Sequence, residues 1–185
     1  MSRYNQLLNI VAEVQPKTIL EIGTWNGMRA CEMALTALHF NESVHYYGFD
    51  LFEDANETTD REEFNVKAHN THDAVSARLA MVQRKMPGFT FTLIKGNTRE
   101  TMAIGTFCAD LVFIDGGHSV DTIKSDYEAV KTSPVIVFDD YYQGGPDTSL
   151  YGANQAVDAI EGVEVLPSTD PVAGGGTVSI AVLRQ

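Results

Sequence analysis

The stretch ILEIGTWNGMRA, residues 19–30, decides the fold. Residues 18–23 (TILEIG) are short, apolar and end at a glycine, which is typical of a buried strand. Residues 28–39 then follow a helical pattern of apolar side chains. Gly23 and Gly27 bracket the turn between the two, where glycine lets a ligand approach the backbone and the free N–H groups of a helix start. The stretch therefore predicts a strand, a glycine turn and a helix, with Glu21 at the end of the strand.

The same alternation continues along the chain. Further strands are predicted at 44–50, 89–95, 109–115 and 134–140, and further helices at 73–86, 118–131 and 153–160. Strands this apolar need cover on both faces, which favours a parallel sheet between two layers of helices. The last two strands, 163–167 and 176–184, are joined by a loop too short for a parallel crossover, so they should pair antiparallel. We expect an α/β fold with a Rossmann-like, doubly wound, mostly parallel sheet in one domain, residues 1–185.

Composition narrows the class of partner. The chain has 185 residues, with 13 Lys+Arg against 25 Asp+Glu and a formal net charge of -12. This excess of acids argues against nucleic acid and against an anionic membrane surface, because both require clustered cations. The N-terminus resembles no signal peptide, and two cysteines are too few for a disulfide framework. We therefore expect a cytoplasmic protein.

The glycine turn departs from the dinucleotide-binding pattern. Its spacing is G-x-x-x-G, and Trp25 and Met28 stand where that pattern has its second and third glycines. Glu21 would also repel a pyrophosphate. A cofactor without phosphates fits this turn better.

Acidic residues follow the other predicted parallel strands. Asp50 ends the second strand, where an acid can bind both hydroxyls of a ribose. Asp115 and His118 lie in FIDGGHS (113–119), and Asp139 and Asp140 follow the fifth strand. The carboxyl ends of parallel strands meet at one edge of a sheet, so the last three carboxylates can converge. Such a set suits Mg²⁺, with Mn²⁺ or Ca²⁺ as alternatives. Strand alternation, however, sends Asp139 and Asp140 to opposite faces unless the chain has left the strand.

With these motifs the sequence resembles the class I S-adenosylmethionine-dependent methyltransferases. It is most similar to metal-dependent O-methyltransferases of the catechol O-methyltransferase type and to a bacterial group described as sugar O-methyltransferases or cephalosporin hydroxylases. The resemblance implies a seven-stranded sheet of order 3-2-1-4-5-7-6 with the last strand antiparallel. It implies a cofactor site at Glu21, Gly23, Thr24, Gly27, Asp50, Leu51, Asn97, Thr98 and Asp115, and Mg²⁺ ligands at Asp115, Asp139 and Asp140. His118 would be the catalytic base, with Asp115 beside it.

The leading hypothesis is metal-assisted transfer of a methyl group from S-adenosylmethionine to a hydroxyl of a small sugar or catechol-like molecule. One alternative removes the metal and uses Asp115 and His118 as the base. A nucleotide-binding oxidoreductase and a non-catalytic binding module are further alternatives. A homo-oligomer is compatible with this reading, because a partner's loop could complete so small a pocket.

Loops invite further interpretations. Loop 51–72 is expected near the cofactor as a lid, with His69 and His72 in a solvated approach to the next helix. Tyr141, Tyr142 and Tyr151 could wall an acceptor pocket or only pack their loop.

Overall fold

The computed structural model describes residues 1–103 and 105–185. Its described residues form one seven-stranded sheet of order β3-β2-β1-β4-β5-β7-β6. β1 to β5 pair in parallel, and β7 pairs antiparallel with both β5 and β6. The expected fold and strand order are confirmed. The strands are β1 Thr18–Ile22, β2 Val44–Asp50, β3 Phe89–Lys95, β4 Leu111–Ile114, β5 Val135–Gln143, β6 Val163–Val165 and β7 Thr177–Arg184.

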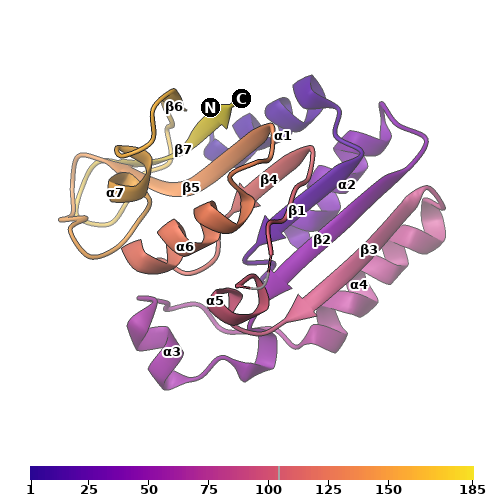
Figure 1. Cartoon of the computed structure of the whole chain (residues 1–185), viewed down its shortest axis with the longest axis horizontal. Helices are drawn as coiled ribbons and strands as arrows, with labels where there is room; N and C mark the ends of the chain where they lie inside the picture. The colour runs from indigo at the N-terminus through magenta and orange to yellow at the C-terminus, as the bar shows by residue number, and fades with distance from the viewer. Residues whose placement is uncertain (104) are drawn as a thin grey trace.

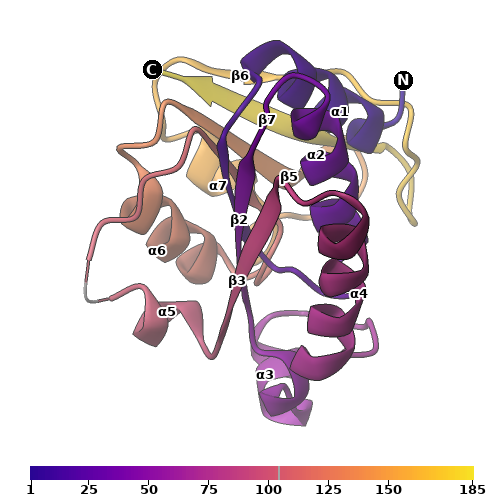
Figure 2. The same ribbon diagram turned by 90° about the vertical axis from the view of Figure 1, so that its right-hand side faces the viewer.

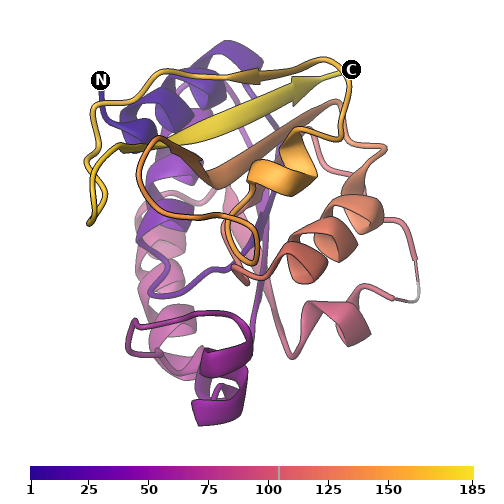
Figure 3. The ribbon, with the colours of Figure 1, turned by 90° about the vertical axis from the view of Figure 1, so that its left-hand side faces the viewer.

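Helices cover both faces of the sheet. Figures 2 and 3 show α1 (Arg3–Val14), α2 (Met28–Leu38) and α4 (His72–Lys85) on one face, and α5 (Thr98–Thr101), α6 (Val120–Val130) and α7 (Asn154–Val157) on the other. The short helices η1 (Phe52–Asp54) and α3 (Glu57–Glu62) lie between β2 and α4, and α3 projects beyond the carboxyl ends of the strands (Figure 1). None of the described helices is long and apolar enough to cross a membrane.

The central strands are buried on both faces. In β4, Leu111 and Phe113 pack into the core under α1, α2 and α4, while Val112 and Ile114 pack into the core under α6 and α7. Side chains alternate between the two faces of a strand, so two buried faces require a nearly unbroken apolar run. This is why the parallel strands could be recognised from the sequence.

Helix α1 was not predicted. It begins after Ser2, whose side chain accepts a hydrogen bond from the backbone N–H of Asn5. Leu7, Ile10 and Val11, at helical spacing, are buried against the sheet face that α2 also covers. The helix contacts α2 and β7. Arg3, its first residue, contacts Asp139 of β5, the strand that pairs with β7.

Strand β5 continues past residue 140, where the sequence had predicted its end. A bulge interrupts its pairing with β7 between Phe138 and Tyr141, and Asp140 adopts a left-handed backbone conformation with φ 57°. A bulge breaks the strict alternation of side chains. Asp139 and Asp140 therefore both reach Arg3 of α1, which strand alternation alone would have prevented.

The turn after β1 depends on a glycine. Gly23 has φ +90°, and a Cβ there would lie 1.9 Å from the carbonyl oxygen of Asp115. We expect Gly23→Ala to lower the free energy of unfolding by about 3 kcal/mol or more, since the turn must move away from β4. Gly105→Ala is the control, because a Cβ there meets no described atom within 4 Å. Urea unfolding measures both, and equal stability of the two variants would contradict this close contact.

Candidate functional site

A cleft opens at the carboxyl ends of β1 to β4. It encloses about 950 Å³ of space that is partly open to solvent. The turns after β1, β2, β3 and β4 form one wall, and residues 51–71, here called the covering segment, form the other. Most of the predicted site residues line the cleft: Gly23, Asp50, Leu51, Asn97, Thr98, Asp115 and His118.

Asp50 is held rigidly at the rim of this cleft. The backbone N–H of Trp25 donates to its Oδ2 and that of Phe52 to its Oδ1, both at 2.7 Å. Each carboxylate oxygen can accept a further hydrogen bond. The carboxylate is thus fixed in orientation and still able to bind two hydroxyl groups.

Glu21, Thr24 and Gly27 lie behind the cleft wall instead of on it. Glu21 is fully buried and accepts a hydrogen bond from the Tyr46 hydroxyl, which lies 3.2 Å from Thr24 Oγ1. Its Oε1 has no partner among the described residues. Burial raises the pKa of Glu21 to about 8, against the opposing effect of the Tyr46 hydrogen bond. Gly27 starts α2 with φ 74°.

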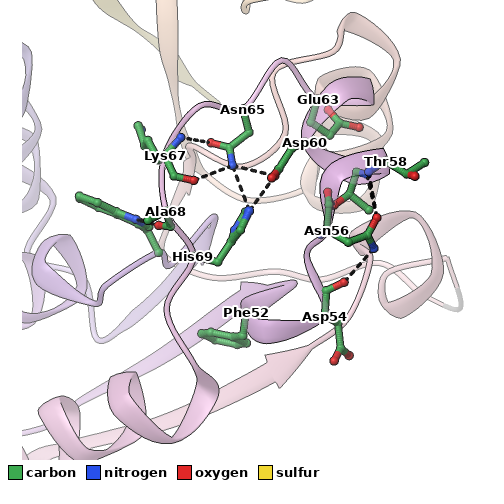
Figure 4. A network of polar contacts seen from close by, with 12 residues as sticks. Phe52, Asp54, Asn56, Thr58, Asp60, Glu63, Asn65, Lys67, Ala68 and His69 are labelled. Atoms are coloured by element: carbon green, nitrogen blue, oxygen red, sulfur yellow. Dashed lines mark hydrogen bonds and ion pairs between the residues drawn. The ribbon is translucent and has the colours of Figure 1, made fainter.

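The covering segment is held together by its own polar side chains. Asp60 Oδ1 contacts Asn65 Nδ2 at 2.9 Å and His69 Nε2 at 2.7 Å (Figure 4). The Asn65 side chain also donates to the carbonyl of Lys67 and accepts from the backbone N–H of Lys67. The indole N–H of Trp25 donates to the carbonyl of Ala68 at 2.9 Å, which ties the segment to the turn after β1. His69 therefore has a structural partner, and His72 is the first residue of α4.

The other end of this segment contacts the start of α6. Glu63 Oε2 accepts from the backbone N–H of Ser119 at 3.0 Å, and Oε1 from the Thr122 hydroxyl at 2.6 Å. The carbonyl oxygen of Glu63 lies 3.1 Å from Nδ1 of His118. Since a carbonyl can only accept, Nδ1 carries a proton.

His118 also forms an ion pair with Asp140. Its Nε2 lies 3.0 Å from Asp140 Oδ2. Burial by itself would lower the pKa of His118, but the hydrogen bond and charge of Asp140 raise it overall. The pKa of Asp140 is lowered despite its burial, because His118 and Arg3 favour its charged form. Below the raised pKa of His118 the pair is an imidazolium beside a carboxylate, and above it His118 is neutral.

Asp139 pairs with Arg3. Its Oδ1 lies 2.7 Å from Arg3 Nε, and Arg3 also lies 3.9 Å from Asp140 Oδ1. Burial raises the pKa of Asp139 to about 6, and the charge of Asp140 adds to this, while Arg3 opposes both. Burial and the same two aspartates raise the pKa of Asp115.

The three aspartates do not fit a metal site as they stand. Among the described residues, no three His, Cys, Asp or Glu side chains are arranged to hold an ion. An ion at Asp139 and Asp140 would have to displace the guanidinium of Arg3 and the imidazole of His118. The Mg²⁺ site stays a prediction that this geometry does not favour.

Three aromatic rings pack against one another in segments that adjoin the contacts of His118. Tyr151 lies 5.7 Å from Phe64 and 5.6 Å from Tyr142, measured between ring centroids. The backbone N–H of Gly152 donates to the carbonyl of His118 at 2.8 Å, which fixes this loop next to His118. Tyr141 turns elsewhere and bonds Asp158.

Several residues of the site were missed by sequence reasoning. Arg3, Glu63 and Lys67 carry no motif. The apolar spacing of residues 7–11 could have indicated α1, but no sequence signal pairs Arg3 with Asp139.

Comparison with known proteins identifies the family. Residues 20–141 match the model of the methyltransferase domain family, and the chain belongs to that family. This confirms the expected methyltransferase. No curated protein sequence matches the chain.

Solved structures share the fold. The O-methyltransferase TomG from Streptomyces achromogenes, in complex with SAM, has a TM-score of 0.63 at 16% identity over 98% of this chain and 79% of its own. The O-methyltransferase from Bacillus cereus, in complex with SAH, has 0.63 at 15%, over 98% and 80%. The calicheamicin methyltransferase CalS11 has 0.62 at 20%, over 98% and 76%. At such identities the likeness concerns the fold.

The raised pKa of Glu21 makes a prediction about stability. An acid whose folded pKa lies above its unfolded value binds its proton more tightly when folded, so stability falls as pH rises between about 4.5 and 8. Glu21→Gln keeps the acceptor for Tyr46 without the charge. We expect it to match the wild type at pH 5 and to exceed it by about 1–3 kcal/mol at pH 9. Urea unfolding at both pH values tests this, and an equal gain at both would contradict it.

Proposed function

We propose that this methyltransferase transfers the methyl group of S-adenosylmethionine to a hydroxyl oxygen of a small molecule. The observation that carries the proposal is the Asp50 carboxylate, fixed by two backbone amides at the rim of the cleft. The family match supports it, and two structures of the same fold are described with SAM or SAH bound.

The cleft suits such a cofactor. We assign the ribose hydroxyls to Asp50, with Leu51 beside them, and the adenine to Asn97 and Thr98 in the turn after β3. The methionine part would pass Gly23, whose backbone lines the cleft and packs directly against the backbone of Asp115. When bound, the cofactor supplies a methyl group on a sulfonium that is already a good leaving group.

Residues behind this wall complete the proposed cofactor site. Thr24 and Gly27 shape the turn, and Glu21 places a carboxyl group with one free oxygen behind it. A nearby positive charge would favour the ionised form of Glu21.

His118 is the proposed base. Nδ1 is oriented by the carbonyl of Glu63, so Nε2 is the atom that exchanges a proton with the acceptor. The hydroxyl would enter beside Asp140, and His118 would take its proton as the oxygen attacks the methyl group. Asp115 lines the cleft next to His118 and is assigned to contact with the cofactor.

Metal assistance is the alternative, with Asp115, Asp139 and Asp140 as ligands. The ion pairs of Arg3 and His118 with the last two favour a reaction without it. A site that does not chelate its acceptor has no need of two adjacent hydroxyls. This supports a small acceptor that presents one hydroxyl.

The cofactor assignment predicts the effect of one substitution. Asp50→Ala should weaken binding of S-adenosylhomocysteine roughly 10–100-fold, since it removes hydrogen bonds to a charged acceptor. Asp73→Ala, at a fully exposed carboxylate on α4, is the control and should bind like the wild type. Titration calorimetry measures all three. Absence of binding by the wild type at millimolar ligand would overturn the proposed cofactor.

The assignment of His118 predicts a pH dependence. Because its pKa is raised above the usual 6.5, activity should be low near pH 6 and increase through pH 8 as the imidazole loses its proton. His118→Ala should lower kcat about 10²–10⁴-fold and flatten this profile. The control is His39→Ala, at an exposed histidine after α2. Formation of S-adenosylhomocysteine with a panel of phenols and sugars is the readout. A wild-type profile in His118→Ala would place the base elsewhere.

A further inference from the structure

The N-terminal helix contributes a cation to the acidic edge of the sheet. Arg3 reaches three carboxylates from two parts of the chain: Asp139 at 2.7 Å and Asp140 at 3.9 Å in β5, and Asp170 at 3.5 Å in the loop before β7. Asp139 has 3% of its surface exposed, and neither of its oxygens receives a hydrogen bond from the described residues. Arg3 is thus the cation that lies against the buried carboxylate of Asp139.

The guanidinium is held in place and does not sample solvent freely. The centroid of the Tyr4 ring lies 4.5 Å from the Cζ of Arg3 and 4.2 Å from that of Arg29. Arg3 also donates to the Tyr4 hydroxyl at 3.1 Å, and its backbone N–H donates to Asp170 Oδ2 at 2.9 Å. Only 17% of the Arg3 side chain is exposed. An arginine restrained this way has the fixed position of a bound ion.

We infer that Arg3 takes the place of a divalent cation at this edge and is a positioning residue of the site. With Asp139 balanced by Arg3, Asp140 is left to hold Nε2 of His118. If Arg3 were absent, Asp115, Asp139 and Asp140 would share one edge with only His118 and the charge of Lys67 left among the described cations that act on them, which favours uptake of a hard cation. The site is therefore built to work without a metal, and its relevance to methyl transfer rests on the proposed function.

Binding of Mn²⁺ alone tests this inference without cofactor or acceptor. Electron paramagnetic resonance counts free Mn²⁺ in the presence of the full chain. The wild type should bind no more Mn²⁺ than its Asp139→Asn variant does. Arg3→Met, which keeps a long unbranched side chain and removes the charge, should bind Mn²⁺ at least about tenfold more tightly than the wild type.

Matched variants separate this effect from a loss of charge in general. Arg184→Met removes an arginine paired with the exposed Glu13 and Glu164 and should bind no more Mn²⁺ than the wild type. Arg3→Lys restores a cation and should cancel most of the gain. Adding Asp139→Asn to Arg3→Met should abolish it, because Asp139 is the proposed ligand. Circular dichroism checks that each variant is folded.

Two outcomes would overturn the inference. One is Mn²⁺ binding by the wild type that Asp139→Asn removes, which would restore the metal site. The other is a folded Arg3→Met variant without any gain in Mn²⁺ binding. If Arg3→Met does not fold, Mn²⁺ binding by the wild type and by Asp139→Asn can still be compared, and binding that Asp139→Asn removes would still overturn the inference. Failure of S-adenosylhomocysteine binding would contradict the proposed function and leave these measurements of Mn²⁺ unaffected.

Discussion

The close contact between the turns after β1 and β4 is the constraint on which the site depends. Gly23 approaches the carbonyl of Asp115 at a distance that leaves no room for a Cβ. With the backbones this close, the carboxyl ends of neighbouring parallel strands open into one cleft. Asp50 and His118, which follow different strands, then line the same space. A bulkier turn would separate the proposed cofactor residues from the proposed base.

The covering segment closes this cleft through polar contacts with both sides. Ala68 is tied to Trp25 on one side, and Glu63 to Ser119, Thr122 and His118 on the other. The same segment that encloses the proposed cofactor therefore orients the imidazole. Such contacts are individually weak and exchangeable with water, as the predicted role of this segment as a lid would require.

Acidic residues at the carboxyl ends of the strands are balanced by cations of the same chain. The chain carries a formal net charge of -12, and several of its acids are gathered at the carboxyl ends of the strands. Asp139 is buried there and faces Arg3, while Asp140 faces His118. Burying a carboxylate without a partner is costly, so each of these acids is placed against a cation of the same chain. The excess of acids is consistent with a cleft for a positively charged cofactor.

The sequence by itself determined the sheet, since apolar runs and glycine turns are local signals that follow from burial on two faces. It also indicated that Glu21, Asp50, Asp115 and His118 belong to strand ends, although Glu21 proves to lie behind the cleft wall. Only the tertiary structure decided that Arg3 meets Asp139 and that a bulge turns Asp140 toward His118. Those contacts join residues far apart in the chain, and their geometry depends on how α1 packs on the sheet and on a backbone irregularity that no local pattern encodes.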